Sequence, residues 1–133
     1  MSSSNGIGIK GLACSRPRPD DREMIICETM IDMLSYVAIR GIDGKRLFST
    51  AGQISPSQAE CLRSAFQNMP VGSTVVLAVD HDDGGRKLAQ QIRDALAPTG
   101  CPIIEDVPTQ PGADWNDILR RIVSPQDRVP VLS

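Results

Sequence analysis

The sequence predicts an α/β domain built on a parallel sheet of about four strands, with helices on both faces. The continuous apolar, β-branched run of residues 73–79 is typical of a strand covered on both faces of a parallel sheet. A helical pattern follows over residues 86–97 and places Leu88, Ile92 and Leu96 on one face. Further strand and helix patterns alternate along most of the chain, as they do in parallel α/β folds.

The length and composition fit one ordinary globular domain: 133 residues, 41% hydrophobic and 23% charged. No stretch is long and apolar enough to span a membrane, and residues 1–5 lack a signal peptide's basic and apolar regions, so we expect a cytoplasmic protein without a membrane partner. The four cysteines are widely spaced and only one histidine is present, which disfavours a zinc site and indicates reduced thiols.

The net charge of −2 does not indicate a stand-alone nucleic-acid binder, since such a domain usually carries a basic face. If the protein handles nucleic acid, a bound metal or a neighbouring domain must offset its acidic edge.

The chain is expected to consist of a tail over residues 1–21 with a possible short strand at 7–9, a domain over 22–123 and a second tail over 124–133. The tail carries a Gly-x-Gly-x-x-Gly pattern at residues 6–11. That pattern binds dinucleotides only between a strand and a helix, whereas here a proline-rich segment follows it, so we do not favour this interpretation.

The first half of the domain predicts a strand over residues 23–27 that ends at Glu28, a helix over 29–40 and a short strand over 46–50. Ser55 begins a capping box at the start of a further helix. The residues expected on the inner faces of these two helices are Met30, Met33, Leu34, Val37 and Ala38, then Leu62, Ala65, Phe66 and Met69.

The second half predicts a strand over residues 101–104, whose proline favours a sheet edge or a strand start. Asp114 is expected to cap a last helix that carries Ile118, Leu119 and Ile122.

Acidic side chains follow the predicted strands and precede the last helix: Glu28, Asp80, Asp82, Asp114 and Asp117. The carboxyl ends of parallel strands share one edge of a sheet, where ligands of α/β proteins bind, so these carboxylates can converge. Gathered carboxylates raise one another's pKa unless a cation lies between them, and their hard oxygens suit Mg²⁺ or Mn²⁺. The alternative is that helix N-termini simply favour acidic residues, which explains Asp114 well, Glu28 less well and the Asp80–Asp82 pair poorly.

Four segments in this order resemble the motifs of the Toprim domain. They are Glu28 with residues 31–35, the Asp-x-Asp motif of residues 80–86, and the segments 49–52 and 114–119. The last two are similar to the Toprim-like domains of bacterial plasmid and mobile-element proteins, which are often attached to relaxases or primases. The resemblance implies a Rossmann-like parallel sheet and a Mg²⁺ site of the kind shared by topoisomerases, bacterial primases and certain nucleases.

Carried over by position from about residue 22 to residue 121, the resemblance makes Glu28 a general acid or base and makes Glu28, Asp80 and Asp82 the catalytic and metal-binding residues. It allows the backbone at Gly85 to approach a phosphate, with Arg86 and Lys87 as possible phosphate or nucleic-acid contacts; both could equally be solvated helix residues. Four further polar residues are possible accessory groups: Asp32, Asp114, Asn116 and Asp117. We interpret His81 as structural and Trp115 as core in preference to a base-stacking residue.

The resulting hypothesis is a divalent-metal-dependent phosphoryl-transfer module that acts on nucleic acid, DNA in preference to RNA. It would be a primase, nuclease or relaxase-associated module within a larger replication or conjugation protein. The first alternative is a non-catalytic Toprim-like domain that binds or scaffolds nucleic acid. The second is a haloacid-dehalogenase-type phosphatase, which is disfavoured because its nucleophilic Asp normally follows the first strand, where this chain has Glu28. The single tyrosine lies mid-helix, so the chain alone is not a complete topoisomerase.

Overall fold

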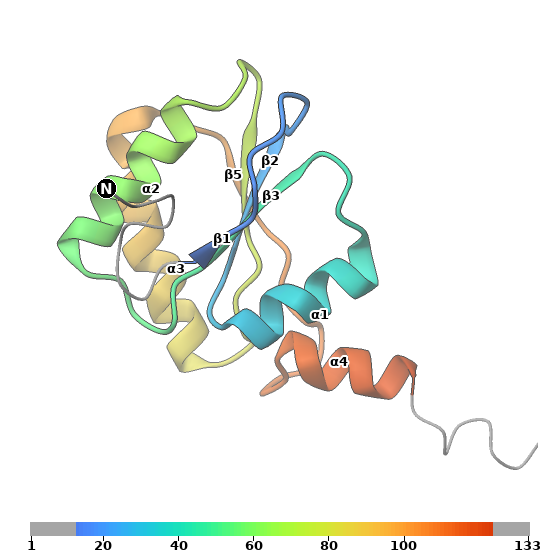
Figure 1. Ribbon diagram of the computed structural model, residues 1–133. Coiled ribbons are helices and arrows are strands. Elements are labelled where there is room, and N and C mark those ends of the chain that lie inside the picture. The colour runs from blue at the N-terminus through green and yellow to red at the C-terminus, as the bar shows by residue number, and fades with distance from the viewer. Residues whose placement is uncertain (1–12, 124–133) are drawn as a thin grey trace, which may run out of the picture.

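The computed structural model describes residues 13–123, which form a five-stranded sheet with helices on both faces (Figure 1). The strands lie in the order β1-β3-β2-β4-β5, and only β1 runs antiparallel to its neighbour. Their bounds are β1 Ala13–Cys14, β2 Glu23–Cys27, β3 Lys45–Ser49, β4 Thr74–Leu77 and β5 Ile103–Glu105. The predicted parallel α/β fold is therefore confirmed, and β5 both lies at the sheet edge and starts directly after Pro102, which fits the two positions that this proline favours. The strand expected at residues 7–9 lies outside the described residues.

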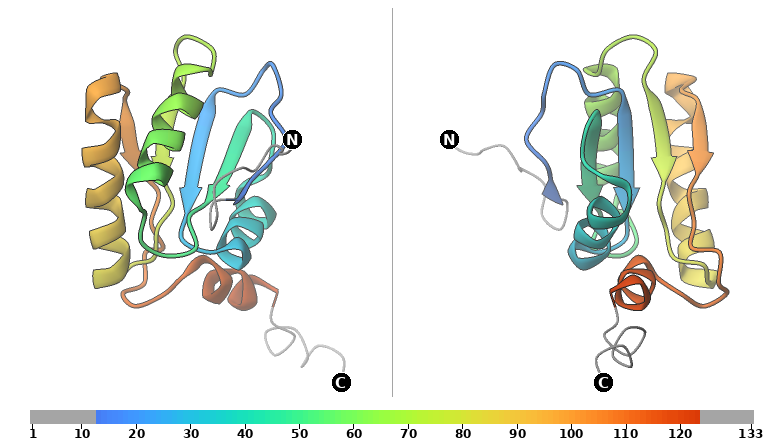
Figure 2. Two further views of the ribbon diagram at one scale, coloured as in Figure 1. Left: turned by 60° about the vertical axis from the view of Figure 1, so that its left-hand side comes forward. Right: turned by 90° about the vertical axis from the view of Figure 1, so that its right-hand side faces the viewer.

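Four α-helices cover the sheet: α1 Met30–Arg40, α2 Pro56–Gln67, α3 Asp83–Leu96 and α4 Trp115–Ile122. A short 3₁₀ helix, η1 Ala97–Thr99, extends α3. Helices α2 and α3 lie on one face of the sheet, and α1 and α4 lie toward the other (Figure 2).

The strand side chains alternate between two hydrophobic cores, as the period of two in a strand requires. Met24 and Ile26 of β2 pack toward α2 and α3, whereas Ile25 and Cys27 pack with Tyr36 of α1 and with Trp115 of α4. The inner face predicted for α3 is confirmed, because Leu88, Ile92 and Leu96 are fully buried.

The predicted inner face of α1 was wrong at three of its residues, since Met30, Leu34 and Ala38 are exposed. Met30 is 51% exposed and Leu34 is 60% exposed, and the helix instead turns Asp32, Ser35 and Tyr36 inward. Tyr36 explains this orientation, since it packs edge-on against Trp115 and its hydroxyl donates to Asp106 at 2.7 Å. Burying the aromatic ring and its hydrogen bond outweighs burying two flexible aliphatic side chains.

The predicted helix starts at α2 and α4 are confirmed. Ser55 and Gln58 form the capping box of α2, and Asp114 and Asp117 form that of α4. Helix α3 begins earlier than predicted because the side chain of Asp82 caps it. Within residues 13–123, no helix is both long and apolar enough to cross a membrane.

Candidate metal centre

The carboxyl edge of the sheet brings together acidic residues that lie far apart in the sequence. Glu28 follows β2 and Asp80 follows β4, and these two strands are parallel neighbours in which Ile26 pairs with Leu77. Asp32 lies in the first turn of α1, four residues after Glu28 in the sequence. The N-cap residue of α4, Asp114, completes the group, because α4 packs against α1 at this edge (Figure 2).

Three of these carboxylates converge closely enough to hold one cation. Asp32, Asp80 and Asp114 each offer an oxygen, and the three oxygens lie within 4.8 Å of one another. Asp32 is almost fully buried, and the other two are half-buried. A set of hard carboxylate oxygens at this spacing suits Mg²⁺ or Mn²⁺, whose preferred ligands are oxygens.

The electrostatic cost of placing these carboxylates close together is largest at Asp80. Burial, together with repulsion from and hydrogen bonding to the neighbouring Asp32 and Glu28 carboxylates, raises the pKa of Asp80 to about 8. Two carboxylates in such contact can hydrogen-bond only when they share a proton. Burial, with Asp32 as a further cause, also raises the pKa of Asp114.

Two oxygens at the site have no partner among the described residues. Oε1 of Glu28 and Oδ1 of Asp80 are buried without a hydrogen bond. A buried carboxylate oxygen without a donor is costly, and a cation would satisfy it. The residues present therefore fit a divalent metal ion.

Helix α4 contributes more than Asp114 to this edge. The backbone N–H of Asn116 donates to Oδ1 of Asp32 at 3.3 Å, and the hydroxyl of Ser35 donates to Oδ1 of Asn116 at 3.4 Å. The indole of Trp115 donates to the carbonyl of Ala78 at 3.1 Å and is 2% exposed, which confirms its interpretation as a core residue. These bonds fix the start of α4 against both α1 and β4.

Asp117 is not one of the three converging carboxylates. Its backbone N–H donates to Oδ1 of Asp114, its carboxylate completes the capping box, and it also pairs with Arg120 at 3.0 Å. The backbone hydrogen bond at Asp114 lowers the pKa of Asp117, and Arg120 assists. The geometry gives Asp117 a structural task, and its accessory role stays a prediction.

Asp82 caps α3 rather than joining the three converging carboxylates. Its Oδ1 accepts from the backbone N–H of Gly85 at 2.7 Å. A metal-binding role for Asp82 stays a prediction, because one oxygen is engaged in the cap.

Gly85 is needed for a reason that the sequence did not reveal. A Cβ at this position would lie 2.0 Å from the carbonyl oxygen of Asp80, so only glycine lets α3 pack this closely against the end of β4. Arg86 pairs with Asp83 on the surface, and Lys87 is exposed beside them. Phosphate contacts by Gly85, Arg86 and Lys87 stay predictions.

The fold and the site together define a Rossmann-like α/β domain with an acidic group at the carboxyl edge of its parallel sheet. Residues 25–119 match the family described as Toprim-like, and the chain belongs to that family. Membership indicates a role in metal-dependent nucleic-acid processing. A comparison with curated proteins found no match.

Sequence reasoning ranked these residues differently from the structure. Asp32 and Asp114 were expected to be accessory, yet both stand in the converging group with Asp80. The signal for Asp32 was its place in the first turn of the helix that Thr29 caps directly after Glu28, because this turn starts at the carboxyl edge of the sheet.

Proposed function

We propose that this Toprim-like domain is a Mg²⁺- or Mn²⁺-dependent phosphoryl-transfer module that acts on DNA. It would work in the cytoplasm as part of a larger primase, nuclease or relaxase-associated protein of replication or conjugation. The observation that carries the proposal is the group of converging carboxylates, with buried oxygens that have no partner among the described residues. The four cysteines are free thiols, which supports a reducing compartment.

The geometry supports the following roles for the residues of the site. Asp32, Asp80 and Asp114 would hold the metal, and Asp82 stands close by at the α3 cap. When bound, the ion supplies charge stabilisation to phosphate oxygens and orients the reacting groups. Glu28 would act as the general acid or base, since it lies against Asp80 and presents a buried oxygen without a partner among the described residues.

Metal binding is tested by thermal unfolding of the protein during titration with MgCl₂ and MnCl₂. We expect the melting temperature to rise, since a ligand at one hundred times its Kd stabilises a protein by about 2.7 kcal/mol. Asp80→Asn should abolish the rise, whereas the matched control Asp83→Asn should keep it, because Asp83 is an exposed carboxylate three residues away. An unchanged melting temperature in the wild-type protein would overturn the metal proposal.

The alternative is a Toprim-like domain that binds or scaffolds nucleic acid without catalysis, and the net charge of −2 favours it. DNA nicking and primer synthesis by the wild-type protein and by Glu28→Gln distinguish the two. A loss of activity in Glu28→Gln supports the catalytic proposal, and equal background activity in both proteins supports the alternative.

A further inference from the structure

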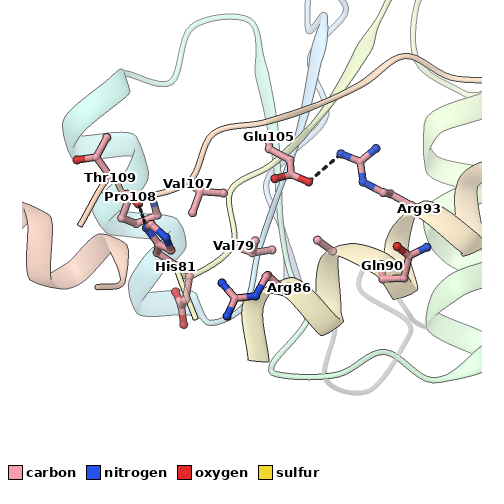
Figure 3. A pocket seen from close by; sticks show the side chains of 11 residues that line it. Val79, His81, Arg86, Gln90, Arg93, Glu105, Val107, Pro108 and Thr109 are labelled. Atoms are coloured by element: carbon pink, nitrogen blue, oxygen red, sulfur yellow. Dashed lines mark hydrogen bonds and ion pairs between the residues drawn. The ribbon is translucent and has the colours of Figure 1, made fainter. Parts of the chain in front are cut away.

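A pocket of about 560 Å³ opens beside the carboxylate group, on the side of α3 (Figure 3). It lies between α3 and the segment that follows β5, and Asp80 belongs both to its wall and to the converging carboxylates. Its volume falls within the range of about 300 to 1,000 Å³ that small-molecule sites have. The pocket therefore adjoins the candidate metal centre.

The floor of this pocket is apolar. Val79 and Ala89 are nearly fully buried and turn their side chains toward it, and Val107 adds a half-buried wall. An apolar floor with a few polar groups at the rim is the usual composition of a small-molecule site.

The rim carries groups that distinguish ligands. Nδ1 of His81 lies 2.7 Å from the carbonyl of Pro108, and because a carbonyl only accepts, Nδ1 carries the proton. The other ring nitrogen, Nε2, is then an acceptor in the neutral imidazole. Arg93 and Glu105 pair at 2.8 Å and neutralise each other at one end of the pocket, while His81 lies at the other end (Figure 3).

Arg86 supplies a positive charge between the pocket and the carboxylate edge. Its side chain is 65% exposed, and its partner Asp83 is 96% exposed. An exposed ion pair of this kind contributes only about 0 to 1 kcal/mol, so Arg86 can exchange Asp83 for a phosphate at little cost.

A nucleotide combines a base, whose ring suits an apolar floor and whose edge suits hydrogen-bonding groups at the rim, with a phosphate, which suits a position next to Arg86 and a divalent cation. We propose that this pocket binds one nucleotide unit, with its base against Val79, Ala89 and Val107 and its phosphate toward Arg86 and Asp80. The inference rests on the proposed function, because the phosphate would then lie at the candidate metal centre. The unit is either a free nucleoside triphosphate or the terminal nucleotide of a strand, and these two sources share the same chemistry.

The experiment blocks the pocket without touching the carboxylates. Gln90 is an exposed residue of α3 at the rim, so Gln90→Phe fills the opening and leaves the core intact. Gln67→Phe is the matched control, since Gln67 is an exposed residue of α2 away from the pocket. Binding of dATP and of a 12-nucleotide single-stranded DNA is measured by calorimetry with MgCl₂, and the Mg²⁺-induced rise in melting temperature is measured in parallel.

We expect Gln90→Phe to weaken binding of at least one probe tenfold or more while retaining the Mg²⁺-induced rise, and Gln67→Phe to leave both unchanged. A loss confined to dATP identifies the free nucleotide as the ligand, and a loss confined to the oligonucleotide identifies the strand end. Wild-type protein that binds neither probe, or equal affinities in wild type and Gln90→Phe, would overturn the pocket proposal. The metal proposal fails separately, by loss of the thermal response in the wild-type protein.

Discussion

The two ends of the parallel sheet differ in whether their buried acidic side chains have cationic partners. At the amino ends of the strands, Asp21 is fully buried and accepts hydrogen bonds from Nε of Arg46 at 3.1 Å and from the backbone N–H of Arg18 at 3.0 Å. At the carboxyl ends, Asp32 and Asp80 lie beside further carboxylates, and no Lys or Arg within residues 13–123 forms an ion pair with either of them.

The difference separates structure from function. A buried acid that has its own cation stabilises the fold as long as the pair stays intact. Buried acids gathered without a cation cost stability, and such groups are concentrated at functional sites. Oδ1 of Asp21 also lacks a hydrogen bond among the described residues, but two arginines pair with this carboxylate, whereas the carboxyl end has no such cation and fits a metal ion.

The largest effect is expected from removing the cation at the amino end. Arg46→Met removes the nearer of the two cations beside the buried Asp21 and leaves only Arg18 at 3.7 Å, so the free energy of unfolding should fall by about 3 to 5 kcal/mol. Urea denaturation measures this loss. The double variant Asp21→Asn/Arg46→Met should recover much of it, and a loss below about 1 kcal/mol in the single variant would contradict the role given to this pair.

The next effect concerns the bond that holds α4 against the carboxyl end. Trp115→Phe removes the indole donor and leaves the buried carbonyl of Ala78 without it, which should cost about 1 to 3 kcal/mol of unfolding free energy. It should also weaken the Mg²⁺-induced rise in melting temperature, because Asp114 precedes Trp115 at the cap of α4. Chemical denaturation and metal titration test the two effects. An unchanged Mg²⁺-induced rise in melting temperature would show that the position of α4 does not affect metal binding.

A smaller effect of opposite sign is expected when a charge is removed from the carboxyl end. In metal-free protein, Asp80→Asn should stabilise the fold by on the order of 1 kcal/mol at pH 8, because it relieves repulsion among the carboxylates. Unfolding in the presence of EDTA gives the value, with Asp83→Asn as the neutral comparison. Destabilisation by Asp80→Asn would contradict the inference that the carboxylates at the carboxyl end repel one another.

The same carboxylate gives the stability of the metal-free protein a pH dependence. The pKa of Asp80 is raised from 3.8 to about 8 in the folded state, so between these values the folded protein holds a proton that the unfolded chain has lost. The contribution of Asp80 to the unfolding free energy is therefore fully present below about pH 4 and falls as the pH rises to about 8. Melting temperatures measured from pH 5 to 9 should decline less steeply in Asp80→Asn than in the wild type, and parallel profiles would refute the shift.

The smallest effect is expected from a surface pair at the amino end. Lys45 lies 3.7 Å from Glu23, whose side chain is 42% exposed, so Lys45→Ala should change the unfolding free energy by less than about 1 kcal/mol. Urea denaturation of Lys45→Ala and Arg46→Met under the same conditions compares their losses of unfolding free energy. The comparison shows whether burial of an ion pair, rather than its mere presence, determines that loss.

Much of the fold could be predicted because its signals are local. The apolar runs of β2 and β4, the cap at Ser55 and the Pro102 edge signal each depend on a few adjacent residues. The inner face of α1 could not be read in this way. Its apolar residues flank a second face that carries Asp32 and Tyr36, and only the contacts with Trp115 and Asp106 decide which face turns inward.

The site was predicted in part for the same reason. The shared edge of parallel strands made it possible to predict that Glu28 and Asp80 would meet. The ranking of Asp82 above Asp32 and Asp114 rested on a motif, and the motif does not show that Asp82 uses one oxygen to cap α3. The approach of Gly85 to the backbone of Asp80 is likewise a three-dimensional fact.

The converging carboxylates come from the first turn of α1, the segment after β4 and the cap of α4. The three residues span most of the described chain, and Asp114 caps the last described helix. During synthesis on the ribosome, the group is therefore assembled only after α4 has emerged and docked. A nascent chain lacking that helix and its N-cap residue would contain Asp32 and Asp80 but not Asp114.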